Sequence, residues 1–471
     1  MILSSKALWD AARMNEVEYG IIEMERNGFA LDVGYCNNKA EEAQINEQAT
    51  LNDLCTWGEG LGVGLNWAEF NWASPKQLVE LFHDKLYCDP SPVWKKGRVN
   101  LRAGDRKLDE TALEWVRDHN SPEIARGVDL LICLRRIRGA IKYLTKLPNY
   151  VAPDGFVHAV SGPASDVDPR AGTITWRLAS KNPEILQIPT DKKKDPYRIR
   201  RAFVAPPGFK LIAADETALE AVIFAHVLIE LFDDHLLADL LVPGADLHAY
   251  NAKRVYGTYL KWERYGHRVD DFPDAAFKSD DYPELQALRQ DIKAVWYGLM
   301  YGKSAYGFAT SLRDASGAPI GQEVAEKIVN ALYEALPAIP RYQEFISDYV
   351  QTHFGIPGLG GAWCDLSELV KTGNKWDLAR ANRIAQNYPM QEGGARIIGA
   401  AMVDILNDPR LRAVGLKLER QVHDELDFRI PDLRLEDEKV AKDLIKHHMT
   451  SYPLKSLLQV SIGSGATWDD C

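Results

Sequence analysis

The sequence contains few cysteines, and none of them form a pair at metal-binding spacing. Only six occur among 471 residues, and none stands in a CxxC motif. Their scatter excludes a zinc ribbon and a disulfide framework, and it is typical of a reducing compartment. The N-terminal residues also lack the apolar core of a signal peptide. The most apolar stretch, Leu219 to Phe232, is too short to span a bilayer and contains Glu220 and Glu230. We therefore expect a soluble intracellular protein with no membrane partner.

The chain also lacks excess positive charge, fixed-period repeats and low-complexity tracts. Its net charge of −11 means that the surface as a whole repels polyanions, so a nucleic-acid partner would need local basic patches. The hydrophobic content of 46% over 471 residues is ample for two or three domains.

The first informative stretch is QVHDELDFRI, from Gln421 to Ile430. Apolar and polar residues alternate on both sides of a His-Asp-Glu triplet, and this period of two predicts half-buried strands. We expect a β-hairpin with His423, Asp424 and Glu425 at or near its tip.

The second stretch is FKLIAADETALEAVIFAH, which begins at Phe209. It predicts a buried strand that runs into Asp215, followed by a helix from Leu219 to Leu231. Two strands of this kind in one sheet could bring the carboxylates of Asp215 and Asp424 together. Paired carboxylates suit Mg²⁺, which prefers oxygen ligands. A single aspartate is more often a helix cap or a surface residue. The interpretation of the pair as a metal site therefore depends on what else the chain contains.

The third stretch, LRQDIKAVWYGLMYG, contains two cations and two aromatic residues at steps of four, namely Arg289, Lys293, Tyr297 and Tyr301. Each lies only ~40° around a helix from the previous one. The cations suit a triphosphate, and the rings suit a base or a sugar. On this pattern alone, an amphipathic helix with core tyrosines fits equally well.

The remaining pattern predicts alternating helical and mixed regions. Residues from about 7 to 57 are expected to be long and helical, Ser74 and Pro75 to start another helix, and residues 92–107 to form a basic loop. Residues 246–392 are again mostly helical, and the C-terminal quarter returns to strands. This order predicts a sheet-bearing domain interrupted by a helical insertion.

A basic stripe lies in LLICLRRIRGAIKYLTK, where Arg138, Lys142 and Lys146 are four residues apart on one side of a helix, with Arg135 nearby. The ordinary interpretation of such a stripe is a solvated face.

Taken together, the three stretches resemble the polymerase motifs A, B and C of family A DNA polymerases, the DNA polymerase I class, in the correct order. Asp215 and Glu220 match motif A, residues 289–302 match motif B, and residues 422–425 match motif C. Further similar segments in register are Asn71 with SPKQL (74–78), WRLASKNPEILQIP (176–189), RIRRAFVAPPGF (198–209), DLHAYNA (246–252) and RIAQNYPMQEGGA (383–395). The resemblance covers nearly the whole chain.

The resemblance implies an α+β fold: a right-hand polymerase with an antiparallel-sheet palm and mainly helical fingers and thumb. The implied divisions are residues 1–150 for the N-terminal lead-in and thumb, 151–230 for the first part of the palm, 231–385 for the fingers and 386–471 for the second part of the palm.

The implied activity is DNA-templated DNA synthesis, in which a primer 3′-hydroxyl is extended with dNTPs by a two-metal-ion mechanism. Asp215 and Asp424 would be catalytic and would bind two Mg²⁺ ions, for which Mn²⁺ can substitute. Lys293 would be the third catalytic residue, able to protonate the leaving pyrophosphate. The implied dNTP-binding residues are Arg289, Lys293, Tyr297, Tyr301, Glu220 and His248, with Glu220 excluding a ribose 2′-hydroxyl. Glu425 is not expected to be a firm ligand.

The resemblance also implies contacts with primer-template DNA. These would be made with the terminal base pair and the template, and by the thumb face with the duplex backbone. The residues concerned are Arg177, His423, Asn387, Gln391, Arg383, Arg138 and Lys142. Residues 192–201 would form a second phosphate-binding strip. A monomer in the cytoplasm of a bacterial or virus-infected bacterial cell is expected, with or without a processivity partner.

The sequence departs from the family at Glu216, Ala218 and Val222, where family members carry other residues. Tyr297 stands where the family has Phe or Tyr, and Tyr implies ready use of dideoxynucleotides. No sequence like the family's nuclease domains precedes the thumb-like segment, so we expect no intrinsic 3′–5′ proofreading. The alternatives are a nucleotidyltransferase like the single-subunit RNA polymerases and a catalytically inactive DNA-binding relative. A metal-dependent phosphohydrolase with a His-Asp pair would require that pair on a helix.

Overall fold

The computed structural model describes most of the chain. The described residues are 11–88, 108–163, 177–190, 194–259, 263–264, 267–309, 312 and 320–471. The basic loop expected at 92–107 lies outside them, as do Lys192 and Lys193.

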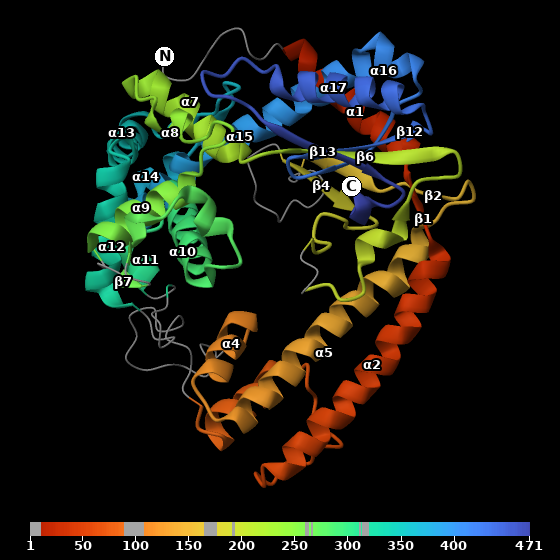
Figure 1. Cartoon of the computed structure of the whole chain (residues 1–471), viewed down its shortest axis with the longest axis vertical. Helices are drawn as coiled ribbons and strands as arrows, with labels where there is room; N and C mark the ends of the chain where they lie inside the picture. The colour runs from red at the N-terminus through yellow and green to blue at the C-terminus, as the bar shows by residue number, and fades with distance from the viewer. Residues whose placement is uncertain are drawn as a thin grey trace.

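The N-terminal region forms an arm of two long helices. These are α2 (Val33–Gly60) and α5 (Pro122–Lys146), which pack side by side and extend away from the rest of the molecule (Figure 1). Helices α3 (Pro75–Val79) and α4 (Glu110–Asp118) accompany them. Ser74 caps α3 by accepting a hydrogen bond from the Gln77 backbone N–H, as its position before Pro75 predicts.

The continuous helical structure expected over residues 7–57 is wrong at one point. Helix α1 (Ala11–Asn27) ends at Gly28, whose φ of +57° leaves the helical region. A short strand, β1 (Phe29–Leu31), follows and pairs with β2 (Phe156–Val157) and β5 (Phe203–Val204). The break turns α2 into a different direction from α1.

The main sheet has four antiparallel strands in the order β11-β12-β6-β13. Their bounds are β6 Phe209–Glu216, β11 Lys417–Val422, β12 Glu425–Pro431 and β13 Val460–Gly465. Ile212 and Phe428 face one hydrophobic core, while Leu211 and Val422 face another on the opposite side. Alternating side chains are buried on both faces, which is why these segments form strands.

A mostly helical insertion separates β6 from β11, as expected (Figure 1). Its helices are α7 Leu219–Phe232, α8 Leu236–Asp239, α9 Leu247–Tyr259, α10 Pro283–Met300, α11 Ala305–Ala309, α12 Gly321–Ala335, α13 Ala338–His353, α14 Ser367–Lys371 and α15 Lys375–Asn407. Helix α7 is apolar nearly all round because it lies inside the core, where ten of its fourteen residues are buried. Among the described residues, no helix is both long and apolar enough to cross a lipid bilayer.

Smaller elements complete the fold. The hairpins are β3 (Val160–Pro163) with β4 (Leu178–Lys181), β7 (Glu263–Arg264) with β8 (His267–Arg268), and β9 (Gly355–Pro357) with β10 (Trp363–Asp365). Helices α16 (Pro409–Ala413) and α17 (Leu435–Thr450) flank the main sheet.

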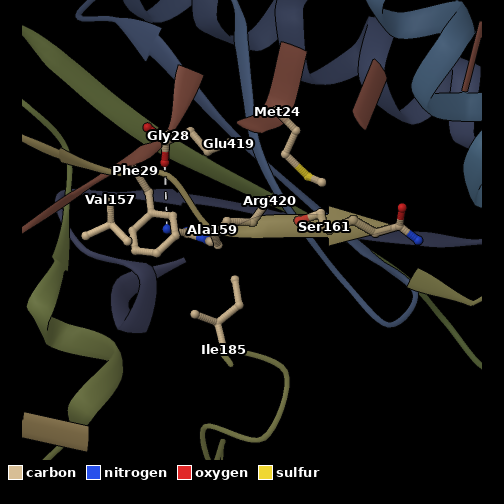
Figure 2. A pocket seen from close by; sticks show the side chains of 10 residues that line it. Met24, Gly28, Phe29, Val157, Ala159, Ser161, Ile185, Glu419 and Arg420 are labelled. Atoms are coloured by element: carbon tan, nitrogen blue, oxygen red, sulfur yellow. Dashed lines mark ion pairs between the residues drawn. The ribbon is translucent and has the colours of Figure 1, made fainter. Parts of the chain in front are cut away.

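A buried arginine joins the main sheet to the N-terminal region. The Arg420 side chain on β11 is 1% exposed, donates to Asp427 Oδ2 at 2.9 Å and lies 3.7 Å from a Glu419 oxygen. Its guanidinium lies over the rings of Phe29 and Trp468, 5.4 and 4.6 Å from their centroids. Figure 2 shows Arg420, Glu419 and Phe29 around one pocket beside β1.

We expect Arg420→Ala to lower the free energy of unfolding by about 3–5 kcal/mol, because it leaves a buried carboxylate unpaired. Urea unfolding followed by circular dichroism measures this loss. Arg434→Ala is the matched control, since Arg434 also pairs with an aspartate (Asp437, 3.0 Å) but has an 86% exposed side chain. The control should lose less than about 1 kcal/mol. Equal losses in the two variants would contradict a structural role for the buried pair.

Candidate functional site

The register of the main sheet places Asp215 beside the hairpin tip. Strands β11 and β12 are joined by a two-residue turn, His423 and Asp424, and Glu425 begins β12 opposite Asp215. The Glu216 backbone N–H donates to the Asp424 carbonyl at 3.1 Å. The expected hairpin and the expected approach of Asp215 and Asp424 are therefore both confirmed.

The turn forces His423 into an unusual backbone conformation. Its φ is +56°, in the left-handed region that non-glycine residues rarely occupy, and its side chain is exposed. Holding a residue there costs on the order of 1 kcal/mol. In spite of this cost, the two-residue turn keeps Asp424 at the end of the main sheet where β6 ends and β12 begins. We call this end of the strands the sheet edge.

The carboxylates at this edge repel one another. Burial, with the charges of Glu425 and Asp424, raises the pKa of Asp215 to about 6. Burial, with the charges of Asp424 and Asp215, raises the pKa of Glu216 to about 8. Burial also raises the pKa of Asp424, although Arg177 and His423 lower it. This concentration of negative charge would be relieved by a cation.

The carboxylates at this edge suit Mg²⁺ better than a metal whose ligands are all protein side chains. Among the described residues, no group of three or more His, Cys, Asp or Glu side chains encloses a metal position. Mg²⁺ is usually bound through one or two carboxylates, with water and substrate phosphates completing its coordination. Both Glu216 side-chain oxygens are buried beside the two aspartates and have no hydrogen-bond partner among the described residues, so they remain available as oxygen donors at this edge.

These pKa shifts predict that Mg²⁺ affinity falls as pH decreases through about 6. Below that pH the Asp215 carboxyl is protonated, and its proton competes with the ion; above it the carboxylate is ionised. Calorimetric titration with Mg²⁺ at pH 5.5 and 7.5 should show weaker binding at the lower pH. Asp215→Asn should reduce this difference because it removes the titrating group. Equal affinity of the unaltered chain at both pH values would contradict the prediction.

Glu425 is engaged by other residues. Its Oε1 accepts a hydrogen bond from Trp468 Nε1 at 2.9 Å and lies 4.0 Å from an Arg200 nitrogen. The Arg200 guanidinium also lies 3.8 Å from the centroid of the Trp468 ring. Glu425 is therefore held by Trp468 and Arg200, and its expected absence from the metal ligands stays a prediction. Nothing in the local pattern at Arg200 or Trp468 marked them as its partners.

Within the strip expected to bind phosphates (192–201), three arginines that the structure describes contact carboxylates of the protein itself. Arg198 donates to Asp469, and Arg201 lies 3.6 Å from the same carboxylate. Together with the Arg200–Glu425 contact, these pairs tie the strip to the C-terminal segment.

Glu220, at the start of α7, is paired with Arg177. Arg177 donates to Glu220 Oε1, and its charge also lowers the pKa of Asp424. Burial raises the pKa of Glu220, while Arg177 acts in the opposite direction. The pair therefore lies next to the carboxylates at the sheet edge.

The predicted helical face on α10 is present, and a buried aspartate fixes its first cation. Arg289 Nε donates to Asp246 Oδ2 at 2.9 Å, and Lys278 contacts the same oxygen at 2.9 Å. Burial would raise the pKa of Asp246, but hydrogen bonds from Lys278, the Ala249 backbone and Arg289 lower it to about 2. Asp246 begins the DLHAYNA segment, but nothing in the sequence indicated that it would pair with Arg289 and Lys278.

The aromatic half of this face is half-buried. The ring of Tyr297 lies 6.0 Å from that of His248 and 6.3 Å from that of Tyr301, which caps the C-terminal end of α10. Burial and the positive charge of Arg289 lower the pKa of His248 to about 4, so its ring is neutral at pH 7. Lys293, between Arg289 and Tyr297, is exposed.

Tyr297 links α10 to the sheet edge. Burial raises the pKa of its hydroxyl, and the charges of Glu220 and Asp424 raise it further. The face of α10 is therefore next to the carboxylates, and the two sets of residues form one site.

Helix α15 contributes Arg383, Asn387 and Gln391 beside the end of α10. Asn387 Nδ2 donates to the Tyr301 carbonyl at 3.3 Å and to the Arg383 carbonyl at 2.7 Å. Steps of four residues place the three side chains on one helix face.

Arg138 and Lys142 belong to the last turns of α5. Arg138 Nε donates to Glu47 of α2 at 2.6 Å, whereas Lys142 is exposed. Nearby, Arg135 donates to the Leu108 carbonyl. The basic stripe is therefore partly neutralised within the arm.

Comparison with known proteins is consistent with this geometry. The family model described as DNA polymerase family A matches residues 62–470. The chain is 30% identical over 403 residues to DNA polymerase I of Deinococcus radiodurans, covering 85% of this chain and 36% of that protein. It is 29% identical over 484 residues to the thermostable DNA polymerase I of Thermus filiformis, covering 99% and 49%. The chain thus spans less than half the length of either relative.

A solved structure, the polymerase domain of Pol1 from M. smegmatis in complex with DNA primer-template and dNTP, has a similar fold. The TM-score is 0.79 at 25% identity, and the match covers 97% of this chain and 70% of that one. The expected α+β fold class, with helices around small antiparallel sheets, is confirmed.

Proposed function

This chain belongs to DNA polymerase family A, and from that premise we propose that it extends the 3′-hydroxyl of a DNA primer with deoxynucleoside triphosphates, directed by a DNA template. The observation that carries the proposal is the approach of Asp215 and Asp424 at one sheet edge, opposite the cationic and aromatic face of α10. A pair of carboxylates next to a triphosphate-binding surface is the arrangement that phosphoryl transfer requires.

Asp215 and Asp424 would hold two Mg²⁺ ions, or Mn²⁺ in their place. When bound, such ions would supply activation of the attacking oxygen and stabilisation of the leaving one. The two aspartates contribute negative charge and a fixed position, because one is part of β6 and the other is in the turn bonded to it.

The residues of α10 would bind the incoming nucleotide. Asp246 fixes the Arg289 guanidinium at Nε, so its terminal amino groups would bind the triphosphate. Lys293 would bind the same group and give a proton to the leaving pyrophosphate. Neutral His248 would donate a hydrogen bond to a phosphate oxygen, and Tyr297 and Tyr301 would pack against the base pair.

Glu220 would exclude a ribose 2′-hydroxyl. Its pair with Arg177 supports this role, because the pair restrains the carboxylate at the site where the sugar would lie. Val222, one of the positions where the chain departs from the family, is 1% exposed in the core and cannot supply this restraint. Selection would then depend on Arg177, which would also contact the terminal base pair.

The regions would divide as a right hand around the DNA. Residues 151–230 and 386–471 would form the palm, residues 231–385 the fingers and the α2–α5 arm the thumb. Arg383, Asn387, Gln391 and His423 would contact the primer-template near the site, and Arg138 and Lys142 would contact the duplex backbone.

A primer-extension assay tests the proposal. A labelled primer on a DNA template with Mg²⁺ is given dNTPs or NTPs in parallel, and extension with dNTPs alone is expected. Equal extension with NTPs would favour the alternative of an RNA polymerase-like enzyme. Binding of duplex without any extension would instead favour an inactive relative. A mismatched primer in the same assay should stay intact, since no proofreading is expected of this chain.

A further inference from the structure

One face of α15 carries a continuous row of side chains that can bind nucleic acid. The row is Trp376, Arg380, Arg383, Asn387 and Gln391, at steps of four, three, four and four residues. In an α-helix these five positions fall within ~80° of one another and span ~22 Å. The first three side chains are exposed and the last two are half-buried. The row thus extends from the nucleotide site to the N-terminal end of the helix.

Trp376 begins this row and is 72% exposed. Its backbone N–H donates to the Asn374 side chain at 2.8 Å, which caps the helix and fixes the first turn. The Lys375 ammonium lies 5.3 Å from the centroid of the indole ring. An indole held in solvent by an ordered turn, with cations beside it, offers a stacking surface and phosphate contacts together.

We propose that this end of α15 binds the single-stranded template before it enters the active site, with an unpaired base stacked on Trp376 and phosphates bound by Lys375 and Arg380. The inference rests on the proposed function, because the nucleotide site sets the direction of the template. Stacking on an exposed ring needs an unpaired base, which a duplex does not offer. Trp376 also lies ~17 Å along the helix from Asn387, which we propose contacts the primer-template near the site.

The test is a comparison of two primer-templates that differ only in the 5′ template overhang, of one or twelve nucleotides. Fluorescence anisotropy gives the dissociation constant of each with the full chain, and their ratio is the gain from the overhang. We expect Trp376→Ala to reduce this gain at least about fivefold. Trp376→Phe should recover part of it, because the ring is kept. Arg380→Ala should reduce the salt dependence of the long-overhang complex by about one unit of slope.

Two controls match these variants. Leu435→Ala removes an 81% exposed apolar side chain at the start of α17, and Lys446→Ala removes an exposed cation from the same helix. Neither should change the gain from the overhang. An unchanged gain in Trp376→Ala would overturn the proposal, as would an equal loss on both substrates. The same loss with a base-paired twelve-nucleotide arm would overturn it in favour of duplex binding.

Failure of the proposed function would look different. The unaltered chain would then not extend the one-nucleotide overhang with dNTPs, whatever its affinity for the overhang. If it extends this substrate but Trp376→Ala binds both substrates as the unaltered chain does, only the template-binding inference fails.

Discussion

Asp424→Asn is expected to lower the rate of primer extension at least about a thousandfold. The substitution keeps the size of the side chain and the backbone bond from Glu216, but it removes the negative charge at the tip of the hairpin. Loss of a metal contact that stabilises the transition state by about 4 kcal/mol corresponds to this factor. Because the DNA contacts that we propose lie mainly on α15 and on the arm, affinity for primer-template should change little.

Single-turnover extension at saturating DNA and dNTP measures the rate, and anisotropy measures DNA affinity separately. Asp432→Asn is the control, since Asp432 follows the far end of β12 and pairs with Lys210 at 3.1 Å. That variant should extend primers normally. If Asp424→Asn kept its rate within tenfold, Asp424 would not be a catalytic metal ligand. Loss of DNA binding in parallel with the rate would instead indicate a structural effect.

The core of the site could be predicted because its signals are local. The alternation on both sides of His423 and the apolar run before Asp215 each predict a strand that ends in a carboxylate. One sheet then brings the two ends together. Likewise, the steps of four from Arg289 to Tyr301 describe a helix face whether or not the fold is known. In each case, the period of the secondary structure appears directly in the sequence.

What could not be predicted depends on contacts between distant segments. Asp246 fixes Arg289 across 43 positions, and Trp468 holds Glu425 across the same separation. Arg138 was predicted to belong to a basic stripe on one side of its helix. Its pair with Glu47 forms only because α2 packs on α5. Such pairs leave no periodic trace, since each partner alone has the pattern of an ordinary surface or core residue.

The break at Gly28 shows a related limit. A glycine inside a helical pattern lowers helix stability only modestly, so composition did not distinguish a tolerated glycine from a stop. The deciding factor was the pairing of β1 with both β2 and β5, which recruits Phe29 to Leu31 into a sheet. Tertiary pairing thus decided the conformation of a short segment whose local propensity was weak.

Lys293→Ala is expected to lower the turnover rate about 10²- to 10⁴-fold, the range for losing a positioned general acid. Lys293 is exposed on α10 between the fixed Arg289 and Tyr297, where we propose that it contacts the triphosphate and the leaving group. Removing it should also weaken nucleotide binding. The Michaelis constant for dNTP and the turnover rate must therefore be measured separately, in steady-state extension over a range of pH.

Lys293→Arg separates charge from proton donation. Arginine keeps a positive charge beside the phosphates but does not release its proton in proteins, so binding should recover more than the rate. Lys327→Ala, on α12, removes an exposed lysine that pairs with Glu323 at 2.8 Å and should change neither quantity. If Lys293→Arg restored the full rate, Lys293 would act through its charge alone, and the pyrophosphate would have to take its proton from another donor.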